Sequence, residues 1–91
     1  MPKLRRLNGL DLVRIFEQFG FVVIRIRGSH HVLRRSSKVL HADGTVHEET
    51  QTVNIPVHGA KPLGSGLLKR IYRESSLYLS EDDLRTHFYS D

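Results

Sequence analysis

The sequence predicts a two-layer α+β domain, with helices on one face of a three-stranded antiparallel sheet. Residues 8–20 have the apolar spacing of a helix, whereas residues 21–27 switch to the two-residue alternation of a strand. Two more strand-like runs, residues 31–42 and 45–57, flank the hairpin turn Asp43-Gly44. Helical patterns return in the last third of the chain. We therefore expect all 91 residues to form one domain in which helices flank the strands in sequence.

Each predicted helix has a recognisable start and an apolar side. Asn8 can cap the first helix, since Asp11 favours a helix N-terminus and Gly20 is a natural stop. Ser65 can cap the second helix, and Ser80 opens a short third helix. The apolar sides comprise, helix by helix, Leu10, Leu12, Val13, Phe16 and Phe19; Leu67, Leu68 and Ile71; and Leu84 and Phe88.

The register of the first hairpin decides which histidine lies beside the arginines of the first strand. A two-residue Gly28-Ser29 loop would pair Arg27 with His30 and divide the apolar residues between the two faces. A three-residue loop that includes His30 pairs Arg27 with His31 and keeps one apolar face, so we expect this form. The alternative is the two-residue loop with a bulge at Ser36-Ser37. The alternation assigns Val22, Ile24 and Ile26 to one face and Val23, Arg25 and Arg27 to the other.

Charge is distributed unevenly along the chain, whose formal net charge is +4. Residues 1–38 carry nine Lys/Arg against two acids, whereas residues 74–91 carry five acids against one arginine. A basic front of this kind suits a polyanionic ligand. The pair His30-His31 follows Gly28-Ser29 among these arginines, and imidazoles transfer protons near neutral pH. Together these features predict chemistry on RNA phosphodiesters.

Composition excludes several other classes of protein. The chain has no cysteine, so it has no disulfide or thiolate metal site, which suits a reducing cytoplasm. The segment Met1–Arg6 lacks the apolar core of a signal peptide, and no apolar run approaches the roughly 18 residues of a membrane span. The six histidines lack metal-ligand spacing. We expect a soluble cytoplasmic protein without a metal, a small-molecule cofactor or a membrane partner.

Three motifs in this order resemble a known family. They are Gly28-Ser29-His30-His31-Val32-Leu33, then Val57-His58-Gly59-Ala60-Lys61, then Gly66-Leu67-Leu68-Lys69-Arg70-Ile71. The chain resembles the HicA (YcfA-like) toxins over roughly residues 8–75, and Leu79–Leu84 looks like that family's C-terminal helix. The departures are a longer hairpin through Ser36–Thr50 and the basic lead Lys3–Arg6.

The resemblance implies a fold, an activity and a partner. HicA toxins are small messenger-RNA interferases with a double-stranded-RNA-binding-domain-like α-β-β-β-α fold, and a HicB antitoxin neutralises them. The implied activity is metal-independent endoribonuclease cleavage with His31, the second histidine of the pair, as the catalytic residue. His30 could be the complementary acid only if it lies in the turn. The expected RNA-phosphate contacts are Arg25, Arg27, Ser29, Lys61 and Ser65.

Two non-enzymatic alternatives share this fold and charge. A non-catalytic double-stranded-RNA-binding module would carry a lysine cluster at the start of its last helix, where only Lys61 stands. A degenerate toxin could serve as a partner-binding scaffold. For an active toxin, we expect an acidic antitoxin to cover His31 and the basic face together.

Overall fold

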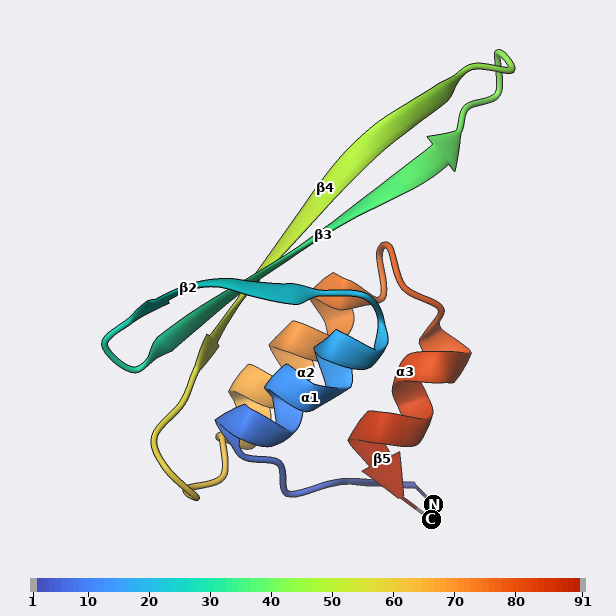
Figure 1. Cartoon of the computed structure of the whole chain (residues 1–91). Helices are drawn as coiled ribbons and strands as arrows, with labels where there is room; N and C mark the ends of the chain where they lie inside the picture. The colour runs from blue at the N-terminus through green and yellow to red at the C-terminus, as the bar shows by residue number, and fades with distance from the viewer. Residues whose placement is uncertain (1, 91) are drawn as a thin grey trace.

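The computed structural model describes residues 2–90, and it has the predicted α+β, double-stranded-RNA-binding-domain-like arrangement (Figure 1). In chain order the elements are β1 (Lys3–Leu4), α1 (Gly9–Gln18), β2 (Val22–Arg27), β3 (His30–Leu40), β4 (Val46–Pro56), α2 (Ser65–Ser75), α3 (Glu81–Phe88) and β5 (Tyr89–Ser90). The main sheet has the antiparallel order β2-β3-β4. Helices α1 and α2 lie against one face of this sheet, and none of the described elements covers the other face.

The caps of α1 and α3 are confirmed, whereas that of α2 differs from expectation. Asn8 Oδ1 accepts a hydrogen bond from the Asp11 N–H at 2.8 Å, and the Asp11 carboxylate accepts one from the Asn8 N–H at 2.9 Å. Ser80 Oγ accepts a hydrogen bond from the backbone N–H three residues on. The predicted Ser65 cap is wrong. Ser65 itself is helical, so the non-helical cap position falls to Gly64, which has no side chain to offer.

The core lies between the helices and the sheet. Its largest fully buried apolar side chains are Leu12, Phe16, Leu33, Ile55, Leu68, Leu84 and Phe88. Each helix contributes predicted inward residues to this set, and Val13 and Ile71 are also buried, whereas Phe19 and Leu67 are only half-buried. Leu10 is 41% exposed, because it lies roughly 160° around α1 from Leu12. The start of α1 therefore shows an apolar side chain to solvent.

The first hairpin has the two-residue loop, so the three-residue loop that we expected is wrong. Gly28 takes a left-handed backbone with φ of 57°, as a tight turn requires. Arg27 pairs with His30, and Ile26 pairs with His31. The strands still form a single apolar face. At two other places one extra residue reverses which side chains of a strand face the helices, and we call this a change of parity.

The first parity change is a bulge in β2. Val23 lies opposite Leu33, but Arg25 lies opposite Val32, so Ile24 is an extra residue without a partner in the ladder. The bulge overturns the predicted division of the strand into two faces. Val23 faces the helices together with Leu33, whereas Arg25 faces solvent.

The second parity change is at the far turn. The loop there comprises residues 42–44, one residue more than the predicted two-residue turn, and the His41 N–H donates to the Thr45 carbonyl at 2.8 Å. No bulge interrupts the β3–β4 pairing. As a result Val53 and Ile55 fall on the helix-facing side, where they join the core.

Beyond the body, β3 and β4 continue as a two-stranded arm of residues 36–50 (Figure 1). Arg35 anchors its base. The Arg35 guanidinium lies 5.4 Å from the ring centre of Phe21 and 5.9 Å from that of Tyr78, and it donates to the Phe19 carbonyl at 3.1 Å. Burial raises the pKa of Tyr78 above its ordinary value.

The two ends of the chain pair with each other, which the sequence did not predict. Strands β1 and β5 are antiparallel, and the Arg5 N–H donates to the Phe88 carbonyl at 2.8 Å. The Leu63 N–H then donates to the Leu7 carbonyl at 2.8 Å. These bonds lay the N-terminal segment across the loop that precedes α2.

Candidate functional site

The helix-free face of the sheet carries the arginines of the first hairpin. Arg25, Arg27 and Arg34 are exposed there, because their ladder partners place them on the side opposite the core. The histidine among them is His30, whose Nδ1 lies 3.2 Å from Asn54 Oδ1. The expectation that His31 projects beside Arg25 and Arg27 is therefore wrong. The two-residue loop places His30, and not His31, on the face that carries Arg25 and Arg27.

His31 lies on the helix-facing side at the end of the sheet. Its partners in the ladder are Ile26 and the fully buried Ile55. The His31 ring is half-buried, and its Nδ1 is buried without a hydrogen-bond partner. An unpaired buried polar atom costs roughly 1–3 kcal/mol, and His31 Nδ1 is the one such side-chain atom among the described residues. The Nε2 edge of the ring is left to meet a ligand.

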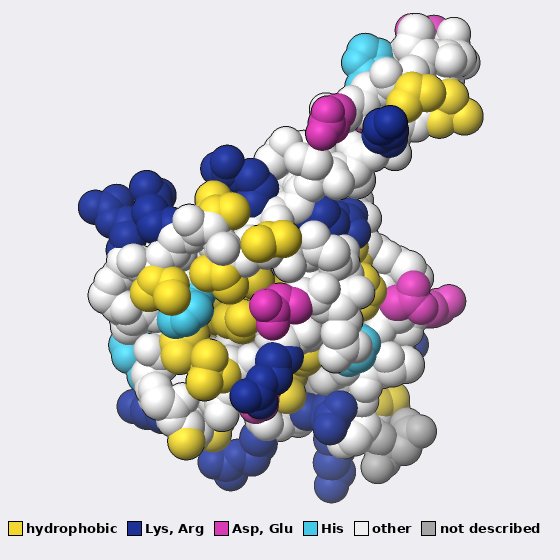
Figure 2. All heavy atoms as spheres, in the orientation of Figure 1, with side chains coloured by type: hydrophobic (Ala, Val, Ile, Leu, Met, Phe, Trp, Pro, Cys, Tyr) yellow, Lys and Arg dark blue, Asp and Glu magenta, His cyan; other side chains and the backbone are white. Residues whose placement is uncertain are grey.

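Apolar side chains border this end of the sheet. Ile26, beside His31, is 58% exposed, and Leu10 at the start of α1 is also exposed. Helix α1 begins against the end of β4, where a Cβ on Gly9 would lie 2.8 Å from Val57 Cα. Figure 2 shows hydrophobic side chains and a histidine between β2 and α1, whereas Lys and Arg side chains project from the outer side of the sheet. The exposed surface beside His31 is therefore apolar at Ile26, which we call the apolar rim.

Ser29 joins the histidine hairpin to the loop that follows β4. Its carbonyl accepts a hydrogen bond from the Val57 N–H at 2.6 Å. The Ser29 carbonyl therefore already has a backbone partner. The Ser29 side chain is half-buried and makes no hydrogen bond among the described residues. This bond holds the start of the 57–64 loop against the hairpin that carries His31.

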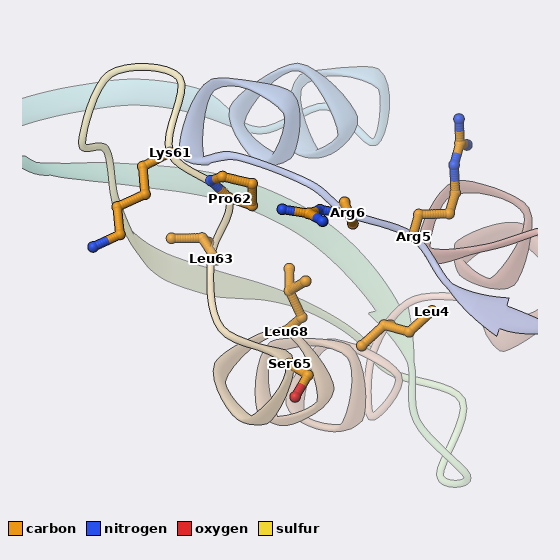
Figure 3. A pocket seen from close by; sticks show the side chains of 8 residues that line it. All are labelled: Leu4, Arg5, Arg6, Lys61, Pro62, Leu63, Ser65 and Leu68. Atoms are coloured by element: carbon orange, nitrogen blue, oxygen red, sulfur yellow. The ribbon is translucent and has the colours of Figure 1, made fainter.

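Lys61 and Ser65 meet in a hollow of about 620 Å³, where Arg5 and Arg6 join them (Figure 3). The sequence did not predict this partnership, because it depends on the pairing of the two ends of the chain. Neither Arg25 nor Arg27 lines the hollow. The expected phosphate contacts therefore fall into two groups, one on the sheet and one at the start of α2.

Two features are absent from residues 2–90. Within this range, no group of three or more His, Asp or Glu side chains is placed to hold a metal ion. No described helix is long and apolar enough to cross a membrane. The groups available for proton transfer near neutral pH are the histidines.

One comparison with known proteins is positive. A family model described as "HicA toxin of bacterial toxin-antitoxin" matches residues 9–77, from the start of α1 to just beyond α2. No curated protein and no solved structure matches the chain. The matched segment contains both histidines of the hairpin, whereas the N-terminal segment and α3 lie outside it.

Proposed function

The chain belongs to the HicA toxin family of bacterial toxin–antitoxin systems, and from that premise we propose that it is an endoribonuclease that cleaves messenger RNA in the cytoplasm. His31 is its catalytic residue, and no metal ion takes part. The observation that carries this proposal is the half-buried His31 ring, whose Nδ1 has no partner within the family segment. His30 is different, since its ring is exposed and bound to Asn54.

The reaction needs one imidazole and a bound phosphodiester. The His31 Nε2 takes the proton of a ribose 2′-OH, and the 2′-oxygen attacks the adjacent phosphorus. The bond from phosphorus to the 5′-oxygen breaks, and that oxygen takes up a proton. The products are a 2′,3′-cyclic phosphate and a 5′-hydroxyl. A single general base contributes about 10²–10⁴-fold, so the enzyme is slow.

His30 does not act on the same phosphodiester as His31. The two residues are neighbours in β3, so their side chains point to opposite faces of the sheet. His30 would be the complementary acid only in the turn, and it lies in the strand, opposite Arg27. We assign His30 to the phosphate-binding face with Arg25 and Arg27, and the second proton transfer to water.

The apolar rim supports a protein partner at this site. Exposed Ile26 lies beside His31 in the ladder without taking part in the reaction. A HicB-like antitoxin that covers this rim blocks the Nε2 edge of His31. Strand β2 lies at the edge of the sheet and carries arginines on the face opposite His31. An acidic partner therefore contacts both faces of β2.

The test is expression alone in bacteria, followed by analysis of the RNA. The native chain arrests growth, His31→Ala does not, and His47→Ala on the arm serves as the matched histidine control and still arrests growth. Purified protein cleaves RNA in EDTA and leaves 5′-hydroxyl ends. Equal growth arrest by the native chain and His31→Ala at matched expression would contradict the assignment. Activity that EDTA removes and Mg²⁺ restores would contradict the histidine mechanism.

A further inference from the structure

The hollow between the N-terminal segment and α2 combines an apolar floor with a cationic rim. The lining residues are Leu4, Arg5, Arg6, Lys61, Pro62, Leu63, Ser65 and Leu68. In Figure 3 the side chains of Leu4 and Leu68 point into the space between β1 and α2, with the side chain of Arg6 above them. Lys61 lies on the loop beside Leu63 and Ser65 at the start of α2, whereas Arg5 points away.

The cations of this hollow form no ion pair with a carboxylate of residues 2–90. No carboxylate lines the hollow. The ion pairs within residues 2–90 are His41–Glu49 and Arg70–Glu74, so Arg6 and Lys61 are free to bind an anion. The hollow therefore favours a negatively charged ligand.

The floor distinguishes a peptide from a nucleic acid. RNA bases are held largely by stacking on aromatic side chains, whereas no aromatic side chain lines this hollow and its floor consists of leucine and proline side chains. An aliphatic pocket with cations at its rim suits a single aliphatic anchor residue of a protein partner. We infer that the hollow binds an acidic segment of the antitoxin, with a leucine-sized side chain on the floor and carboxylates at Arg6 and Lys61.

The composition of the hollow also points to partner specificity. The family match begins at residue 9, so Leu4 and Arg6 lie outside the family segment, whereas Lys61 and Leu68 lie within it. One wall thus lies outside the segment that the family model matches. A toxin must be recognised by its own antitoxin, and specificity depends on contacts that other toxins do not share. This inference rests on the toxin–antitoxin membership and not on ribonuclease activity.

The experiment uses the full chain carrying His31→Ala, so that cleavage plays no part in the readout. The probe is the capped peptide Asp-Glu-Leu-Glu-Asp, added while the NMR signals of the Leu63 and Leu68 methyl groups are followed. We expect these signals to shift with a dissociation constant of about 1 mM, as a short flexible peptide allows. A peptide with serine in place of leucine binds about tenfold more weakly.

Charge-reversal variants locate the site. Arg6→Glu weakens peptide binding about fivefold, and Lys38→Glu, the matched charge reversal on the arm, leaves it unchanged. Equal binding of the leucine and serine peptides would overturn the inference, as would the absence of any shift up to about 10 mM peptide. A 2′-O-methyl oligouridylate that shifts the same signals more strongly than the peptide, with sensitivity to Arg6→Glu, would show a nucleic-acid site instead.

Discussion

His30 and His31 are adjacent in sequence, yet they occupy two different regions of the molecule. His30 is exposed among arginines on the helix-free face, and Asn54 holds its ring. His31 is half-buried at the helix-facing end of the sheet, beside Ile26, with a buried and unpaired Nδ1. The difference teaches that the position in the sheet, and not the sequence neighbourhood, decides which imidazole lies among the arginines and which lies at the apolar end.

The sharpest test of this comparison is the effect of each histidine on cleavage. We expect His31→Ala to lower kcat about 10²–10⁴-fold, because it removes the only proposed proton-transfer group. His30→Ala raises KM about threefold and leaves kcat nearly unchanged, because it removes a phosphate contact that is exposed to solvent. Initial rates on a defined RNA give both constants. A larger loss of kcat in His30→Ala than in His31→Ala would reverse the two roles.

The two regions of β3 differ as strongly in stability. Leu33 is fully buried beside Val23 and Val53, whereas Leu40 on the arm is 72% exposed. We expect Leu33→Ala to lower the free energy of unfolding by about 2–5 kcal/mol and Leu40→Ala by less than about 0.5 kcal/mol. Urea denaturation measures both values. Similar losses for the two variants would show that the arm is covered in solution.

Charge reversal on the helix-free face separates binding from chemistry. Arg27→Glu weakens RNA binding about tenfold and lowers the salt dependence by about one to two counterions, since a phosphate contact is lost and repulsion replaces it. His31→Ala leaves that slope unchanged. Titration at two ionic strengths with an RNA that carries 2′-O-methyl groups checks both statements.

The same Arg27→Glu variant tests the proposed antitoxin surface. If an acidic antitoxin uses both sides of β2, its affinity and its salt dependence fall together with those of RNA. Loss of RNA affinity with an unchanged affinity for the antitoxin would mean that the antitoxin binds elsewhere.

The smallest effect concerns the bond that holds His30. We expect Asn54→Ala to change the rate of cleavage less than about twofold and the free energy of unfolding by about 0.5–1 kcal/mol, because the bond is exposed to water. Rate and urea measurements on one preparation suffice. A loss of activity as large as that of His31→Ala would place catalysis on the helix-free face.

The sequence by itself determined the three helices, the three strands of the main sheet and most of the core. The Asn8 cap, the strand alternation, the glycine turns and the inward residues of the helices are local signals, because each depends on neighbours within one turn or one hairpin. The motifs Gly28–Leu33 and Val57–Lys61 likewise carried the family resemblance, which the match over residues 9–77 bears out. Leu10 departs from this agreement because apolar character alone does not say which side of α1 meets the sheet.

Only the tertiary structure decided the faces of the strands and the partners of the basic residues. One extra residue at Ile24 and one in the far turn reverse the parity, and a period of two cannot reveal such single-residue shifts. The two-residue first loop placed His30 beside Arg27 and His31 beside Ile26. The β1–β5 pairing brought Arg6 to Lys61 in the same way, because contacts between the ends of a chain leave no local pattern in its sequence.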